Sequence, residues 1–233
     1  MSLSNLKKEM DLSRNPEKAK LLSGYFKTGK GEDGDGDIFF GIIVPNQRKI
    51  AKNHSDLTLN DLQNLLSSNI HEYRLTALFI LVDKYQKADD SGRKEIVNFY
   101  LKNTKNINNW DLVDLSAPRI LGDYLIDKNR SILYRLAKSH HLWEKRIAVL
   151  ATFMFIKNHQ FKDSLKIAEI LMNDRHDLIH KAVGWMLREI GKIDKTVEKN
   201  FLKKHCKNMP RTMLRYAIEK FSKKERKFYL NKE

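Results

Sequence analysis

The sequence predicts an all-α protein, built as a curved superhelical stack of two-helix repeats with a concave basic face. Only 4 Pro and 10 Gly occur in 233 residues, which is few for a chain rich in turns or strands. After about residue 57, apolar residues recur at spacings of three and four, as on one face of a helix. Similar segments also return about every 36 residues, a period typical of helix pairs that stack into a curved array.

The N-terminal part, residues 1–28, is expected to form two helices that separate near Asn15-Pro16. Proline is favoured at the first helical position, where its missing N–H costs nothing, and Asn is a good cap immediately before it. The second helix should therefore run from the cap through Ala19 to Phe26.

An acidic, glycine-rich loop is expected next, at residues 28–37. Its alternating acids resemble a calcium-binding loop. However, the sixth position counted from Asp33 is Ile38 where Gly is needed, and the twelfth is Val44 where Glu is needed. We expect the loop to turn the chain or to limit access to the basic surface of the protein.

The apolar run at residues 39–45 has no partner strand elsewhere in the sequence and is interpreted as a packed connection. A basic helix is expected to follow it at residues 47–53. The whole chain, residues 1–233, is interpreted as one repeat domain, with N-terminal helices in residues 1–57 and repeats in residues 58–233.

Four segments align as copies of one helix, and their first residues lie 36, 36 and 35 positions apart. The copies begin at Arg74, Trp110, Arg146 and Lys181, and a fifth, looser copy begins at Arg211. Because equivalent positions of stacked repeats line one surface, the residues at the start of each copy should face the same partner.

The second copy carries an aromatic residue and an acid one helical turn apart, Trp110 and Asp114. Residues at i and i+4 share one face of a helix, and an indole face and a carboxylate both attract a cation. A buried Trp and a solvated Asp are the ordinary alternative for such a pair. The repeat register places Trp185 at the position equivalent to Asp114, so Trp110, Asp114, Arg146 and Trp185 are expected to converge.

The charge of the chain favours a polyanionic partner, with nucleic acid ahead of a membrane surface. Lys and Arg outnumber Asp and Glu by 44 to 29, giving a net charge of +15. Residues 199–233 alone hold 12 basic and 3 acidic residues. Such runs are usually solvated helix faces, but here their number also fits contacts to phosphates, which release counterions on binding.

Several other classes of protein are disfavoured. No run approaches the roughly 20 apolar residues of a membrane span, and the N-terminus lacks the apolar segment of a signal peptide, so we expect a cytoplasmic protein. The single cysteine, Cys206, excludes an internal disulfide and a multi-cysteine zinc site. His176 and His180 have the i, i+4 spacing of metal ligands, but without an adjacent acid a surface pair is the better interpretation, and no metal is expected.

Several stretches in combination resemble the AlkD-like bacterial DNA alkylation repair glycosylases, which are built of HEAT/ARM-like repeats, over nearly the whole chain. The stretches are Asn15-Pro-Glu-Lys-Ala19, Phe40-Gly-Ile42 with Pro45 and Arg48, Trp110-Asp-Leu-Val-Asp114 followed by Leu121-Gly-Asp123, Trp143-Glu-Lys-Arg146, and Lys181-Ala-Val-Gly-Trp-Met-Leu-Arg-Glu189. The last three are specific in combination because their order and spacing match as well as their residues.

The resemblance implies hydrolysis of the N-glycosidic bond of N3- or N7-alkylated purines in duplex DNA, without metal or cofactor and without flipping the base into a pocket. A monomer is expected because a concave DNA-binding surface works well in a single chain. It implies catalytic roles for four residues. Trp110 and Trp185 would flank the deoxyribose, Asp114 would face the anomeric carbon, and Arg146 would hold a nearby phosphate. DNA contacts are expected from Tyr25, Lys145, Lys181, Arg188 and Arg215.

Two departures from the family pattern and two other functions stay open. Asn109 stands where family members often have a second aromatic residue, and the loop at residues 28–37 is longer than in the simplest members. A DNA-binding repeat protein without catalysis and a protein-binding scaffold are the alternatives. For Arg146 the alternative is an ion pair with Glu144 or Asp114, which contributes little when it lies at the surface.

Overall fold

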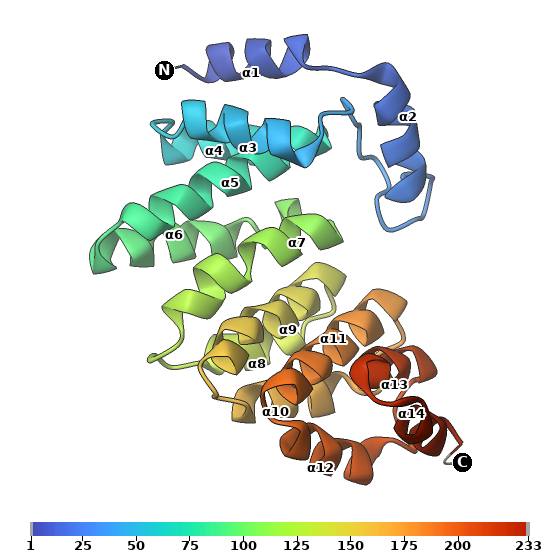
Figure 1. Ribbon diagram of the computed structural model, residues 1–233. Helices are drawn as coiled ribbons and strands as arrows, with labels where there is room; N and C mark the ends of the chain where they lie inside the picture. The colour runs from blue at the N-terminus through green and yellow to red at the C-terminus, as the bar shows by residue number, and fades with distance from the viewer. Residues whose placement is uncertain (1, 232–233) are drawn as a thin grey trace. The chain divides into compact units, whose positions relative to one another are not determined.

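The computed structural model describes residues 2–231 and confirms the all-α prediction (Figure 1). Within that range no strand forms, and Ile38 and Ile70 make one isolated parallel bridge. The α-helices are α1 (Leu3–Leu12), α2 (Pro16–Tyr25), α3 (Val44–Asn53), α4 (Leu59–Leu66), α5 (His71–Lys87), α6 (Asp90–Lys102), α7 (Trp110–Ser116), α8 (Ser131–Ala137), α9 (Leu142–Lys157), α10 (Lys162–Leu171), α11 (Asp177–Ile193), α12 (Lys195–His205), α13 (Arg211–Ala217) and α14 (Lys223–Leu230). Three shorter helical segments are η1 (Thr104–Asn106), η2 (Pro118–Gly122) and η3 (Ile218–Lys220).

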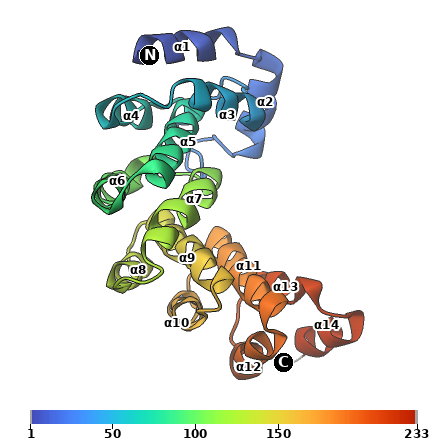
Figure 2. The same cartoon turned by 60° about the vertical axis from the view of Figure 1, so that its left-hand side comes forward.

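The chain packs as two compact units, the first ending at Ser116 and the second starting at Ala117. In the first unit α5 lies between α3 and α4 on one side and α6 and α7 on the other (Figures 1 and 2). Every residue of α5 from His71 to Val82 is buried, which is expected of a helix surrounded by others. The first unit is therefore organised around α5, which contains the first repeat copy.

The predicted pair of N-terminal helices is confirmed. Asn15 caps α2, because its side-chain oxygen accepts a hydrogen bond from the Lys18 backbone N–H at 3.0 Å, and Pro16 is the first helical residue. The Asn15 backbone N–H also donates to the Phe40 carbonyl at 2.8 Å, so the turn between α1 and α2 is tied to the connection that precedes α3.

The apolar run forms the packed connection that the sequence predicts, and Glu72 holds it. The Glu72 carboxylate is fully buried and accepts backbone hydrogen bonds from Phe40 at 3.0 Å, Gly41 at 2.8 Å and Ile42 at 3.2 Å. Gly41 has a φ of +80°, and a Cβ there would lie 2.1 Å from the Asn15 carbonyl oxygen, so only glycine fits. The helix that follows starts at Val44, earlier than predicted, because Pro45 fits its first turn.

The acidic segment at residues 28–37 is a loop, as predicted, and two of its acids bond to its own backbone. The Glu32 carboxylate accepts from the Gly29 N–H at 2.9 Å, and the Asp35 carboxylate accepts from the Gly31 N–H at 2.8 Å. These bonds turn the loop back on itself, and they use carboxylate oxygens that a calcium site would need.

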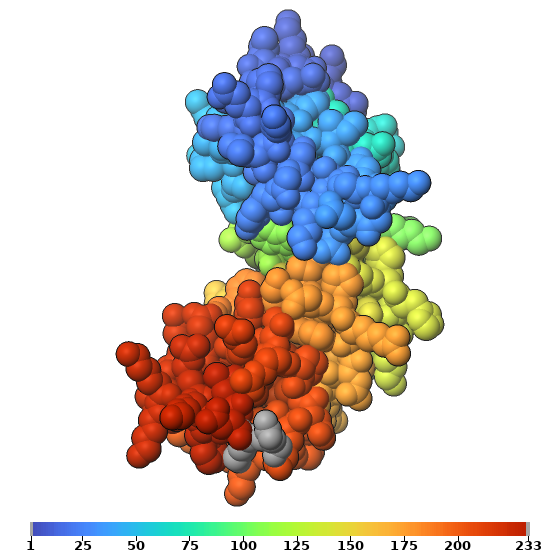
Figure 3. All heavy atoms as spheres, turned by 90° about the vertical axis from the view of Figure 1, so that its right-hand side faces the viewer, coloured from blue at the N-terminus to red at the C-terminus, as the bar shows by residue number. Residues whose placement is uncertain are grey.

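In the second unit α11 packs against α9, α10, α12 and α13, and α9 also packs against α8 and η2. Two glycines allow the closest of these approaches. A Cβ on Gly122 would lie 2.4 Å from the Ala151 carbonyl oxygen of α9, and one on Gly184 would lie 2.5 Å from the Met213 carbonyl oxygen of α13. The C-terminal helices α13 and α14 present the side chains drawn in red in Figure 3.

All five predicted repeat copies are helices. Arg74 lies in α5, Trp110 begins α7, Arg146 lies in α9, Lys181 lies in α11 and Arg211 begins α13. Within each unit the copies that follow one another are neighbours, since α5 packs against α7, α9 against α11 and α11 against α13. The period read from the sequence therefore corresponds to successive packed helices.

Candidate functional site

Trp110 begins α7 and packs against two aromatic residues at the end of α2. Its backbone N–H donates to the Asn109 side-chain oxygen at 2.8 Å, which fixes the start of the helix. The indole stacks on Phe26, with ring centroids 5.1 Å apart and planes 8° apart, and the Tyr25 ring meets it edge-on at 6.0 Å. The structure thus brings together Trp110 and Tyr25, two residues that the sequence singled out, although they are 85 positions apart.

Asp114 lies one turn after Trp110 on the same helix, and both side chains are partly exposed. Behind them, Tyr100 is fully buried and its hydroxyl is 2.9 Å from the Ser116 hydroxyl. Burial raises the pKa of Tyr100, and the negative charge of Asp114 raises it further. Asp114 is therefore close enough to the buried Tyr100 for its charge to influence the hydroxyl.

A buried charged cluster that the sequence analysis missed lies beneath this helix. His71 of α5 is 1% exposed, and its two ring nitrogens lie 2.9 Å from an oxygen of Asp37 and 2.9 Å from an oxygen of Asp111. Asp37 also accepts from the Arg74 guanidinium at 2.6 Å and from the Asn109 amide at 3.3 Å. We call the three residues Asp37, His71 and Asp111 the carboxylate–histidine bridge.

Both ring nitrogens of His71 face carboxylates, which only accept hydrogen bonds, so both must carry hydrogen and the imidazole is charged. Burial by itself lowers the pKa of His71, but the charge and hydrogen bond of Asp111 and the hydrogen bond of Asp37 outweigh it and raise the pKa to about 9. For Asp37 the effects have the opposite signs: burial raises the pKa of its carboxyl, and the hydrogen bonds and charges of His71 and Arg74 outweigh burial and bring the pKa below its ordinary value.

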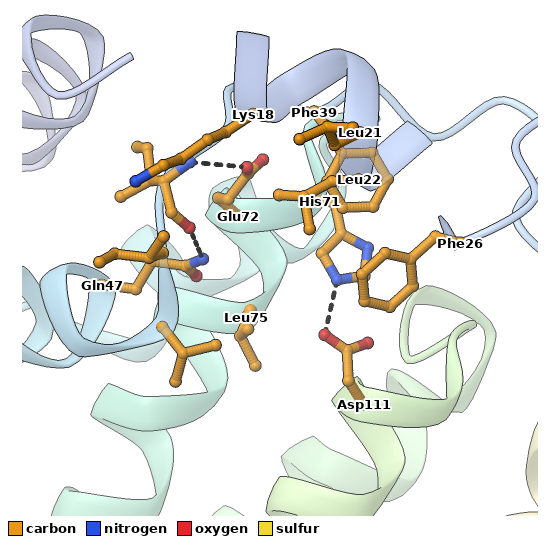
Figure 4. Close-up of a pocket in the computed structure, with 13 residues that line it drawn as sticks. Lys18, Leu21, Leu22, Phe26, Phe39, Gln47, His71, Glu72, Leu75 and Asp111 are labelled. Atoms are coloured by element: carbon orange, nitrogen blue, oxygen red, sulfur yellow. Dashed lines mark hydrogen bonds and ion pairs between the residues drawn. The ribbon is translucent and has the colours of Figure 1, made fainter. Parts of the chain in front are cut away.

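A pocket of about 300 Å³ adjoins the carboxylate–histidine bridge in the first unit (Figure 4). Its lining is mostly apolar and comes from α2, α3, α5 and the connection before α3, with His71 and Asp111 on one wall. Phe26 lines this pocket and also stacks on Trp110. Phe26 thus belongs both to the lining of the pocket and to the aromatic contact that supports Trp110.

In the second unit, Arg146 of α9 is 5% exposed and one of its guanidinium nitrogens donates to the Leu178 carbonyl at 2.7 Å. Trp185 of α11 is partly exposed, and its indole N–H donates to the Glu189 carboxylate at 3.0 Å. The Phe153 ring lies 6.3 Å from the indole of Trp185. These contacts fix the ring plane of Trp185 relative to α9 and α11.

The basic residues predicted to contact DNA differ in their surroundings. Lys145 forms an ion pair with Asp174, Lys181 pairs with Asp177 at 2.6 Å, and Arg188 pairs with Glu189 and Glu219. The hydrogen bond to Asp177 raises the pKa of Lys181 above its ordinary value. Arg215 of α13 is exposed.

The predicted site residues thus fall into two groups. Trp110, Asp114 and Tyr25 lie in the first unit, and the others lie in the second. Within the first unit the structure brings Tyr25 against Trp110 and leaves Asp114 one turn away. The convergence of the two groups on one substrate stays a prediction.

Two further features of residues 2–231 bear on the class of protein. No helix in that range combines the length and apolar composition needed to cross a bilayer. In the same range no three His, Cys, Asp or Glu side chains gather as a metal site would require. Of the histidines with metal-ligand spacing, His176 accepts from the Leu178 N–H at 3.2 Å, and His180 bonds to the Asp174 carbonyl.

A family model described as DNA alkylation repair enzyme matches residues 6–221 of the chain. Among solved structures, a predicted DNA alkylation repair enzyme from Enterococcus faecalis is similar with a TM-score of 0.69 and 17% identity, covering 91% of this chain and 98% of that one. The protein smu.31 from Streptococcus mutans is similar with a TM-score of 0.51 and 18% identity, covering 92% and 94%. At these identities the two likenesses show a shared fold. No protein with curated annotation matches the sequence.

Proposed function

Because the chain belongs to the family of DNA alkylation repair enzymes, we propose that it is a DNA glycosylase that hydrolyses the N-glycosidic bond of cationic N3- or N7-alkylated purines in duplex DNA. The observation that carries the proposal is the pair Trp110 and Asp114, which α7 presents on adjacent turns with the indole braced by Phe26 and Tyr25.

The chemistry of such substrates matches this pair. An N3- or N7-alkylated purine already carries positive charge, so the base leaves as a neutral molecule and needs little help from a general acid. Positive charge then develops on the sugar as an oxocarbenium ion. An indole face attracts such a cation by about 0.5–2 kcal/mol, and a carboxylate adds Coulomb stabilisation and can orient the attacking water. In this scheme one carboxylate suffices, without the second carboxyl usual in sugar hydrolases.

The second unit supplies the remaining roles in the proposal. We assign Trp185 to the other side of the deoxyribose and Arg146 to a phosphate near Asp114. The hydrogen bonds of Trp185 to Glu189 and of Arg146 to the Leu178 carbonyl hold both side chains in one orientation before DNA arrives. Such preorganisation reduces the conformational entropy lost on binding.

Duplex DNA is the proposed partner, and the net charge of +15 supports it. Tyr25 and Arg215 are exposed in the free protein and can contact the sugar-phosphate backbone of the DNA directly. Lys145, Lys181 and Arg188 are paired with acids in the free protein, so contact with a phosphate exchanges one ion pair for another. We therefore expect the exposed residues to contribute more to affinity than the paired ones.

The test is release of base from duplex DNA that carries N7-methylguanine, compared between the parent protein and Asp114→Asn. We expect the rate of release to fall by about 100-fold or more, because the amide removes the charge and keeps the shape. The dissociation constant for the same duplex, measured by fluorescence anisotropy, should change less than about threefold and should rise with salt.

Three other outcomes have distinct meanings. If binding weakens as much as activity in Asp114→Asn, the role given to Asp114 is wrong. If the parent binds DNA but releases no base from N7-methylguanine or N3-methyladenine duplexes, the protein binds DNA without catalysis. A folded protein that ignores DNA at moderate salt would point to a protein-binding scaffold.

A further inference from the structure

We propose that the carboxylate–histidine bridge is the positioning device of α7, which ties the acidic loop and α5 to the first turn of that helix and so sets the placement of Trp110 and Asp114. The bridge residues do not touch the substrate in this scheme. The inference deepens the proposed function and rests on it only for its catalytic consequence, since the placement of Trp110 can be measured without any reaction.

Three segments distant in sequence meet at one imidazole. Asp37 is the last residue of the acidic loop, His71 begins α5, and Asp111 is the second residue of α7. The two carboxylates bond to opposite ring nitrogens, each at 2.9 Å. Because a charged imidazole directs its two N–H groups in fixed directions, it sets the distance and angle between the loop and α7.

A second route leads from His71 to Trp110 through stacked rings. The His71 imidazole stacks on Phe39 with centroids 4.5 Å apart, Phe39 stacks on Phe26 at 5.0 Å, and Phe26 stacks on Trp110 at 5.1 Å. The same imidazole therefore constrains the backbone of α7 through Asp111 and the indole plane through the two phenylalanines. Moving His71 should displace Trp110 by both routes.

The charges around His71 are balanced within the cluster. Asp37 faces it from the loop, Asp111 from α7, and Arg74 from the next turn of α5, while the rings of Phe26, which follows α2, and of Phe39 in the connection pack against the imidazole. Lys18 of α2 lines the same pocket as His71. Arg74 is 3% exposed and also donates to the Ser68 carbonyl at 2.8 Å. Two carboxylates facing two cations make a buried network that is costly to break at any member.

Asn109 joins the bridge to Trp110 at the start of α7. Its side-chain amide donates to Asp37 at 3.3 Å, and its side-chain oxygen accepts from the Trp110 N–H at 2.8 Å. The residue before Trp110 thus links the acidic loop directly to the first turn of the helix. This gives the acidic loop a role that its composition did not reveal, since its last carboxylate holds α7 in place.

The test follows the signal of Trp110 by 19F NMR in protein made with 5-fluorotryptophan, in which the three tryptophans give separate signals and Trp110→Phe assigns one of them. We expect His71→Gln to shift and broaden the Trp110 signal and to leave those of Trp143 and Trp185 in place. Asp111→Asn, which keeps an acceptor for the ring, should shift it less than Asp111→Ala does.

The matched control is His54→Gln. His54 is also a buried histidine of the first unit, 2% exposed and 2.7 Å from the Glu9 carboxylate, but it joins α3 to α1. If His54→Gln moves the Trp110 signal as much as His71→Gln does, or if neither moves it, the bridge stabilises the fold without positioning α7 and the proposal is wrong.

A titration of the parent needs no substitution and covers the case in which the variants fail to fold. Raising the pH removes one donor from His71, so the Trp110 signal should move with the same midpoint as the His71 ring signals. A Trp110 signal that ignores the His71 titration would overturn the proposal.

Catalysis gives the readout that depends on the proposed function. For N7-methylguanine duplexes we expect kcat of His71→Gln to fall by roughly 10- to 100-fold through misplacement of Trp110 and Asp114, with DNA affinity within about threefold. If the parent releases no base while the Trp110 signal responds as described, the proposed function fails and the positioning role stands.

Discussion

Replacing His71 by Gln should change the pH dependence of stability in a direction and a range fixed by the bridge. The ordinary pKa of His is 6.5, and the two carboxylates raise that of His71 to about 9 in the folded protein. Between these values the folded state keeps a proton that the unfolded chain releases. The contribution of His71 to stability is therefore fully present below pH 6.5 and is lost as the pH rises through about 9.

The size of the effect follows from the same two values. A difference of one pH unit corresponds to 1.36 kcal/mol, so the full change between pH 6.5 and about 9 is on the order of 3 kcal/mol. The other titrating groups are common to both proteins, so their pH-dependent contributions to the free energy of unfolding cancel when the parent is compared with His71→Gln. The difference in free energy of unfolding should thus shrink by about that amount across this range.

Urea unfolding of both proteins at pH 6, 7, 8 and 9, followed by circular dichroism, measures the difference. A difference that stays constant with pH, within about 0.5 kcal/mol, would mean that His71 is not held as a cation between Asp37 and Asp111. A difference that grows with pH would contradict the sign of the argument.

Two further predictions concern the second unit. Gly122→Ala should lower the free energy of unfolding by about 1–3 kcal/mol in urea, because its Cβ would lie 2.4 Å from the Ala151 backbone oxygen, whereas Gly24→Ala, with nothing within 4 Å, should be neutral or slightly stabilising. Glu198 is 1% exposed and burial raises its pKa to about 8, so its contribution to stability is present below pH 4.5 and is lost as the pH rises to about 8. Between pH 5 and pH 9 the free energy of unfolding of Glu198→Gln, which cannot ionise at this position, should rise relative to that of the parent by on the order of 4 kcal/mol, as measured by urea unfolding at the two pH values; no gain would show that the folded protein ionises Glu198 as readily as the unfolded chain.

The helices could be predicted because their signals are local. Asn15-Pro16 marks the start of α2 by a cap that forms within four residues, and the recurrence of similar segments identified the helices that begin or contain Trp110, Arg146 and Lys181. The shared helix face of Trp110 and Asp114 follows from the helical period alone. The predicted start of α3, at residue 47, lies too far along the chain, because Pro45 was interpreted as the end of the preceding apolar run, whereas the helix begins at Val44.

The support of the candidate site could not be predicted in the same way. His71 is 34 residues from Asp37 and 40 residues from Asp111, and no period or motif links the three. The stack of Phe26 on Trp110 likewise joins the end of α2 to the start of α7. Nor does the sequence show that Lys145 is paired with an acid, because its partner Asp174 is 29 residues away.

The sequence by itself determined the helical class, the repeat period, the excess of positive charge and the residues that share one face of α7, since each depends on composition or on spacing along one helix. Only the tertiary structure decided which side chains stand behind that face. Their selection depends on how α2, the acidic loop and α5 pack against α7, and a buried ion such as His71 is tolerated only where this packing supplies partners for both of its nitrogens.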